Sequence, residues 1–171
     1  DNVDRAELGS EDNVAVARVG GTLVRESGRL TAALRSDLEY RHYLRNTYDD
    51  ETLLNLDLVT RATLVEERMF WVLEDTFGQL LTDTLLPDVV TNRGDINVLR
   101  TGPDLVLRLS EQLRLEASAR YQDSYFEATD LDGSSLGGSI GAYRLLGDTD
   151  TLGLQADYTE YTPDLELRPE Y

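Results

Sequence analysis

The sequence predicts an all-β protein, an antiparallel up-and-down transmembrane β-barrel of which about eight strands are visible. Three observations support this prediction. Apolar and polar residues alternate over stretches much longer than the five or six residues of an ordinary strand. Charged residues fall on one side of these stretches, and the gaps between stretches are short and long in turn. Short turns at one rim and longer loops at the other are typical of outer-membrane barrels.

The clearest alternation starts at Leu30, where even-numbered residues up to Leu44 are mainly apolar and odd-numbered ones mainly polar. The segments 54–64, 105–109 and 113–121 repeat this pattern. Side chains alternate between the two faces of a strand, so each segment has one apolar and one polar face. The pattern predicts strands at residues 13–26, 29–45, 52–66, 69–81, 97–109, 113–127, 136–146 and 151–161.

Residues 1–171 are expected to form a single domain. It has a loop-like start at 1–12, a strand meander at 13–161, and a loop or the start of a further strand at 162–171. The short turns are expected near residues 27–28, 67–68, 111–112 and 147–150, and the longer loops at 46–51, 82–96 and 128–135.

The charged face cannot lie in a hydrophobic core, because each unpaired buried charge costs several kcal/mol. In a barrel this face lines the lumen, where opposite charges on neighbouring strands are able to pair. A soluble acidic β-sandwich stays open as an alternative. The predicted lumen-lining residues are Arg35, Asp37, Glu39, Arg41, Asp57, Arg61, Arg100, Asp104, Arg108, Arg114, Glu116 and Arg120.

Tyrosine and tryptophan concentrate where hydrocarbon meets lipid headgroups, so aromatic residues near strand ends indicate the membrane boundaries. The predicted aromatic girdle consists of Tyr40, Trp71, Tyr121, Tyr125, Tyr143 and Tyr158. Any one of these residues is also explained by simple packing, and it is their clustering that favours a girdle.

Composition excludes several classes of function. Thirty-three acidic residues against sixteen basic ones give a net charge of −17, which disfavours binding to nucleic acid. The chain has no cysteine and a single histidine, His42, so thiolate sites and multi-histidine metal sites are excluded. We predict no enzymatic activity, no cofactor and no metal site. The acidic loops at 49–51, 130–133 and 148–150 are interpreted as solvated loops, with divalent bridging to lipopolysaccharide phosphates as a weaker hypothesis.

Some local motifs resemble the outer-membrane β-barrel family associated with PEP-CTERM protein sorting and exopolysaccharide production. The motifs are Asp1-Asn2-Val3, the strand Leu30–Leu44 with its Asp37-Leu38-Glu39-Tyr40-Arg41 core, and the segments Leu54–Leu64, Trp71–Gln79 and Gly102-Pro103. Barrels of that family have more than eight strands, so the resemblance implies that this chain is a segment of a larger barrel. A self-closed barrel of eight strands is the alternative.

The predicted function is a porin-like channel of a Gram-negative outer membrane, working by passive diffusion or export through a charged lumen. The expected partners are outer-membrane lipid and lipopolysaccharide, and the resemblance adds exopolysaccharide or a secretion partner. The alternative function is a non-conducting scaffold in which arginine–carboxylate pairs close the lumen and the loops bind a partner protein or polysaccharide. The sequence does not specify an oligomeric state.

Overall fold

The computed structural model describes residues 13–164 except 87, 89, 128–131 and 148. These residues form one antiparallel sheet of eight strands and one short 3-10 helix, η1. The elements are β1 (Val14–Glu26), β2 (Leu30–Tyr43), β3 (Glu51–Val65), β4 (Met69–Leu81), η1 (Val90–Asn92), β5 (Arg93–Arg108), β6 (Leu113–Phe126), β7 (Gly133–Leu145) and β8 (Thr151–Pro163).

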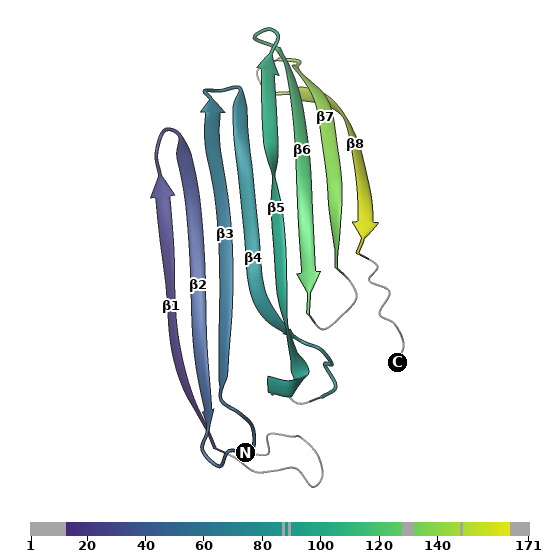
Figure 1. Cartoon of the computed structure of the whole chain (residues 1–171). Helices are drawn as coiled ribbons and strands as arrows, with labels where there is room; N and C mark the ends of the chain where they lie inside the picture. Colours follow the sequence, from purple (N-terminus) through teal and green to yellow (C-terminus); the bar gives the residue numbers. More distant parts are fainter. Residues whose placement is uncertain (1–12, 87, 89, 128–131, 148, 165–171) are drawn as a thin grey trace.

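Each strand pairs with its neighbours in sequence, in the order β1 to β8. The turns β1–β2, β3–β4, β5–β6 and β7–β8 lie at one end of the sheet, and the longer connections lie at the other (Figure 1). We call these ends the short-turn end and the long-loop end. The prediction of an all-β antiparallel meander with this alternation of connections is confirmed.

The sheet is open within the described residues, so the alternative of a self-closed eight-stranded barrel is not observed, and a barrel wall of more strands stays a prediction. β1 and β8 each pair with one neighbour only, on the inner side of the sheet. Closure requires both of these edge strands to form a further hydrogen-bonded ladder. The predicted strands agree closely with the observed ones, although β5 and β7 start earlier, at Arg93 and Gly133. Their first residues are charged or small and do not alternate in hydropathy, so sequence periodicity could not detect them.

The strands are staggered across the sheet. Successive cross-strand partners lead from Asp157, in the middle of β8, to Arg29, in the turn that joins β1 to β2. This corresponds to a shift of about one residue per strand, and with a rise of about 3.3 Å per residue and strands about 4.8 Å apart it implies a tilt of about 35–40°. The partners run from Asp157 through Ser139, Ser118, Asp104 and Phe70 to Thr63, whose N–H donates to the Arg29 carbonyl at 2.8 Å.

The sheet has no second layer and almost no hydrophobic core among the described residues. The only hydrophobic side chains there that are buried are Tyr43, Leu53 and Val72. Leucines and isoleucines in the strands are widely exposed, up to 80% for Leu154. Sheet cohesion therefore comes mainly from backbone ladders and from cross-strand side-chain pairs.

Candidate functional site

All twelve predicted lumen-lining residues lie on one face of the sheet, which we call the polar face. Directly opposed residues of antiparallel strands project from the same face. The register joins Arg35 to Asp57 across β2 and β3, and the same parity continues to β6. We call the opposite side, which carries residues such as Leu34, Leu58 and Leu115, the apolar face. That the polar face lines a lumen stays a prediction.

Every arginine among the twelve has a carboxylate within ion-pair distance. Most of these pairs are solvated, as in Arg35–Asp37, where the side chains are 68% and 52% exposed. Exposed pairs of this kind each contribute about 0–1 kcal/mol. The pairs are Arg35–Asp37, Arg41–Glu39, Arg61–Asp104, Arg100–Glu74, Arg108–Glu67, Arg114–Glu116 and Arg120–Asp104.

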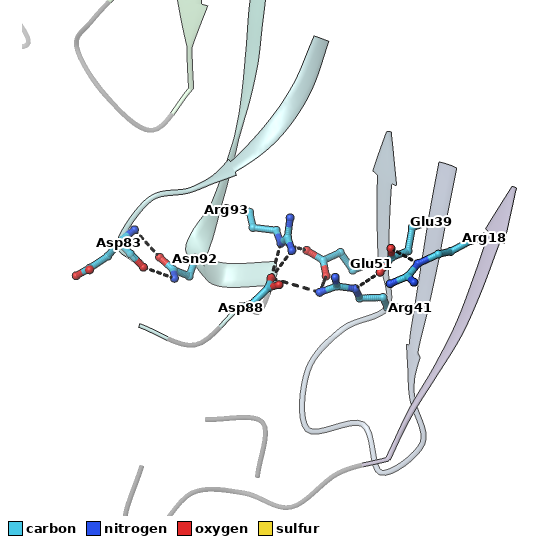
Figure 2. A network of polar contacts seen from close by, with 8 residues as sticks. All are labelled: Arg18, Glu39, Arg41, Glu51, Asp83, Asp88, Asn92 and Arg93. Atoms are coloured by element: carbon cyan, nitrogen blue, oxygen red, sulfur yellow. Dashed lines mark hydrogen bonds and ion pairs between the residues drawn. The ribbon is translucent and has the colours of Figure 1, made fainter. Parts of the chain in front are cut away.

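The densest group of charges lies at the long-loop end, where six side chains alternate in sign (Figure 2). We call it the rim network. Arg18 Nε donates to Glu39 Oε2 at 2.5 Å, and Arg41 Nε donates to the other Glu39 oxygen at 2.6 Å. Asp88, in the β4–β5 connection, pairs with Arg41 at 3.3 Å and also with Arg93. The full set is Arg18, Glu39, Arg41, Glu51, Asp88 and Arg93.

Glu51 is the most enclosed charge of the rim network, with 4% of its surface exposed. Its carboxylate oxygens lie 3.5 Å from Arg41 Nη1 and 3.2 Å from Arg93 Nε. Neither oxygen has a hydrogen bond of normal geometry within the described residues. Its charge is therefore balanced by two nearby guanidinium groups rather than by solvent.

The rim network fills a split in the sheet. β3 and β4 pair only from Leu56 and Phe77 toward the short-turn end. Beyond that point Glu51–Asn55 pair with β2 alone, and β4 continues with β5 alone. Arg93 from β5 and Asp88 from the loop bridge this split to β2 and β3. The network thus joins two halves of the sheet where the backbone ladder does not.

Sequence reasoning missed Asp88, Arg93 and the role of Arg18. The sequence predicts a loop over both Asp88 and Arg93, and hydropathy carries no information about which charges a loop brings to a strand. The sequence predicts a solvated acidic loop at Glu51, whereas Glu51 is the first residue of β3 and is buried. The run of like charges at 49–51 gave no signal for this, because burial depends on the long-range contact with Arg93.

A second cluster surrounds the Gly102-Pro103 step near the middle of the sheet. Gly102 has φ +154°, and a Cβ there would lie 2.0 Å from the Ala119 carbonyl oxygen. Proline has no N–H to donate, so the ladder is interrupted at this step. Arg120 Nη1 donates to the carbonyls of Pro103 and Ala119 at 2.9 and 2.8 Å.

Asp104 pairs with two arginines in this cluster, Arg120 and, at 3.1 Å, Arg61. The Arg61 guanidinium also lies over the Phe70 ring, 4.1 Å from its centroid. Three predicted residues on three different strands are thus brought together, which fixes their side chains on the polar face.

Glu74 and Asp75 project from opposite faces, as their adjacency requires. Glu74 lies on the polar face and pairs with Arg100. Asp75 lies on the apolar face, where Asn97 donates an amide hydrogen to it at 3.0 Å.

Five of the six predicted girdle residues lie on the apolar face by register: Tyr40, Trp71, Tyr121, Tyr125 and Tyr158. Tyr143 is the exception, because its register partner is Arg114 on the polar face. Its ring lies 5.2 Å from the Arg114 guanidinium and packs where Cβ atoms on Gly141 and Gly153 would stand. In β7 both faces carry small residues, so alternation did not distinguish them.

His42 lies on the apolar face near the long-loop end, opposite Ala15. Its Nδ1 is 2.7 Å from Asp50 Oδ1, and the Tyr40 hydroxyl donates to Asp50 Oδ2 at 2.6 Å. The hydrogen bond from Tyr40, followed by that with His42, lowers the pKa of the Asp50 carboxyl below its usual value. This contact ties the β2–β3 loop to β2.

Asp130 and Asp148 of the other acidic loops lie outside the described residues. In the part that is described, Asp132 Oδ1 accepts the Phe126 N–H at 2.6 Å. No group of three or more metal-ligating side chains occurs among the described residues. The same residues include no helix of the length and hydrophobicity needed to span a bilayer.

Comparisons with known proteins found no family model, no curated protein and no solved structure that matches this chain.

Proposed function

We propose that this sheet is part of the wall of an outer-membrane β-barrel, with the apolar face toward lipid and the polar face toward a hydrated lumen. The observation that carries the proposal is an exposed apolar face that runs across all eight strands, opposite a face of ion pairs, with no second layer in the described chain. In water such an extended apolar surface needs a cover, and lipid chains supply one.

Strand geometry supports the same function. Strands of 13 to 16 residues exceed the roughly 9–11 needed to cross the hydrocarbon of a bilayer. The tilt implied by the stagger, about 35–40°, falls within the range of barrels. Closure of this sheet into a barrel needs a further ladder on both edge strands, either between β1 and β8 or with other strands of a larger barrel, as the family resemblance implies.

Passive diffusion of ions and small polar solutes is the mechanism we propose for the lumen. Side chains such as Arg35, Arg100 and Arg108 are half or more exposed on the polar face, so water has access to them. Exposed charges on a pore wall set ion selectivity. The proposed association with exopolysaccharide export rests on the family resemblance alone.

The alternative is a non-conducting scaffold in the same membrane. One observation favours it: each predicted lumen arginine already has a carboxylate partner, so the arginine–carboxylate pairs are able to fill a narrow interior. In that case the acidic loops would bind a protein or polysaccharide.

Single-channel recording in planar bilayers distinguishes these functions. The channel predicts discrete conductance steps, and Arg35→Gln or Arg108→Gln should lower the preference for anions over cations without preventing insertion. Thr22→Asn, an uncharged change on the polar face of β1, is the matched control and should leave ion selectivity unchanged. Insertion without any conductance would reject the channel in favour of the scaffold.

A further inference from the structure

Four arginines at the short-turn end of the sheet have no carboxylate within ion-pair distance in the described part of the chain. They are Arg25, Arg29, Arg68 and Arg144. All four side chains are exposed. We call them the short-turn arginines, because all four lie at the short-turn end of the sheet.

Two of these side chains project from the apolar face. Arg25 is opposed in register by Ala32. Arg144 lies between Leu113 and Leu152, so its register partners on both sides are leucines. An arginine in such surroundings extends its aliphatic part along the apolar surface and places the guanidinium at the boundary with water.

The other two lie in the turns themselves, Arg29 between β1 and β2 and Arg68 between β3 and β4. The turns at this end also carry Glu66, Glu111 and Asp150, and none of these carboxylates lies within ion-pair distance of the four arginines. Glu26 lies on the polar face, opposite Thr31, and Glu67 pairs with Arg108. The basic groups are therefore left at the edge of the apolar face.

The long-loop end of the apolar face has the opposite charge. Its strand residues there include the carboxylates of Asp95, Asp123 and Glu160. Among the strand residues, the apolar face thus carries arginines, Arg25 and Arg144, at one end and carboxylates at the other, with a band of leucines between. A membrane leaflet rich in anionic phosphates attracts the basic end and repels the acidic end.

We propose that the short-turn arginines bind the phosphates of anionic phospholipid headgroups and thereby orient the sheet, with its short turns in the phospholipid leaflet. This inference rests on the proposed function, because it requires the apolar face to be in contact with lipid. Guanidinium groups bind phosphate oxygens through paired N–H donors, which favours phosphate over a zwitterionic surface.

The chain contains its own reporter for a test. Trp71 is its single tryptophan, lies on the apolar face and is 41% exposed. It is the third residue of β4, directly after the turn that contains Arg68. Lipids that gather around the short-turn end of β4 should therefore quench Trp71 fluorescence if their acyl chains carry bromine.

The experiment compares the full chain in phosphatidylcholine vesicles that contain phosphatidylglycerol, with either one lipid or the other brominated. For the wild type we expect phosphatidylglycerol to be enriched around Trp71 by about three- to fivefold at low salt, and less at high salt. In Arg25→Gln/Arg29→Gln/Arg68→Gln/Arg144→Gln the ratio should fall to about one. The charge-matched control Arg35→Gln/Arg61→Gln/Arg100→Gln/Arg114→Gln, on the polar face, should keep the wild-type ratio.

Failure of this inference is distinguishable from failure of the proposed function. Equal quenching by both lipids in the wild type, or a loss of preference in the control as large as in the test variant, overturns headgroup binding by the short-turn arginines. No quenching by either lipid means that the apolar face does not contact acyl chains, which overturns the proposed function and this inference with it.

Discussion

Glu51 is the residue at which burial and charge oppose each other most strongly in the described chain. Its carboxylate is removed from water, and Arg41 and Arg93 supply the compensating charge. Such a group stabilises the fold only while its partners are in place, because an uncompensated buried charge is far costlier than an exposed one.

Glu51→Gln should lower the free energy of unfolding by about 3 kcal/mol, because it leaves Arg41 and Arg93 without one of their carboxylates in a poorly solvated position. Urea unfolding in detergent micelles, followed by Trp71 fluorescence, measures the change. Asp37→Asn removes an exposed partner of Arg35 and should cost less than about 1 kcal/mol. Equal losses for the two variants would show that the rim network is solvated.

Gly102→Ala should destabilise the sheet by about 2–4 kcal/mol, because a Cβ collides with the Ala119 carbonyl and φ is unfavourable for alanine. Gly21→Ala is the matched control on β1, where no atom lies within 4 Å of the added methyl group. The same urea experiment reports both variants. A change at Gly102 as small as that at Gly21 would contradict the close approach of β5 and β6.

The lowered pKa of Asp50 makes one contribution to stability dependent on pH. Because the carboxyl is more acidic in the folded protein, its contribution is complete above the unfolded value of about 4 and is lost as the pH falls through the lower folded value. Denaturant midpoints at pH 5 and pH 3 should therefore differ more for the wild type than for Asp50→Asn. Parallel pH profiles would count against the contacts with Tyr40 and His42.

At the scale of one strand, adjacent residues face different surroundings. Leu58 and Val59 sit next to each other in the middle of β3, the first on the apolar face and the second on the polar face. The proposed function assigns lipid to Leu58 and water to Val59, although both side chains are aliphatic.

Leu58→Arg should lower the free energy of unfolding in lipid vesicles by about 2–4 kcal/mol, as arginine does at a bilayer midplane. Val59→Arg should cost about 1 kcal/mol or less, because water and neighbouring carboxylates receive the new charge. Both variants are measured by urea titration in the same vesicles. A reversed order of the two costs would place the polar face toward lipid.

For the molecule as a whole, the open sheet means that stability depends on what covers its apolar face and its two edge strands. Neither is covered by another part of the described chain. We expect the refolded chain to remain dispersed in detergent and to associate when detergent is removed without lipid, as analytical ultracentrifugation would show. A monodisperse monomer without detergent would instead favour the soluble β-sandwich.

The number of strands, the alternation of turns and loops, and the polar face follow from hydropathy patterns along the sequence alone. Alternation at a period of two gives each strand one apolar and one polar face. Residues as far apart as Arg35 and Arg120 could therefore be assigned to the same polar face. It was insufficient where residues are uniformly small, as around Tyr143, and where strands start with polar residues, as at Arg93.

The open edges of the sheet and the identity of the paired charges are visible only in the three-dimensional structure. The split between β3 and β4 and the approach of Asp88 to Arg41 join residues far apart in the sequence. Pairing of this kind depends on register, stagger and loop path, and hydropathy encodes none of them. Because hydropathy does not encode ion pairing, the sequence does not distinguish one arginine from another. The structure separates those with a carboxylate partner from the four short-turn arginines.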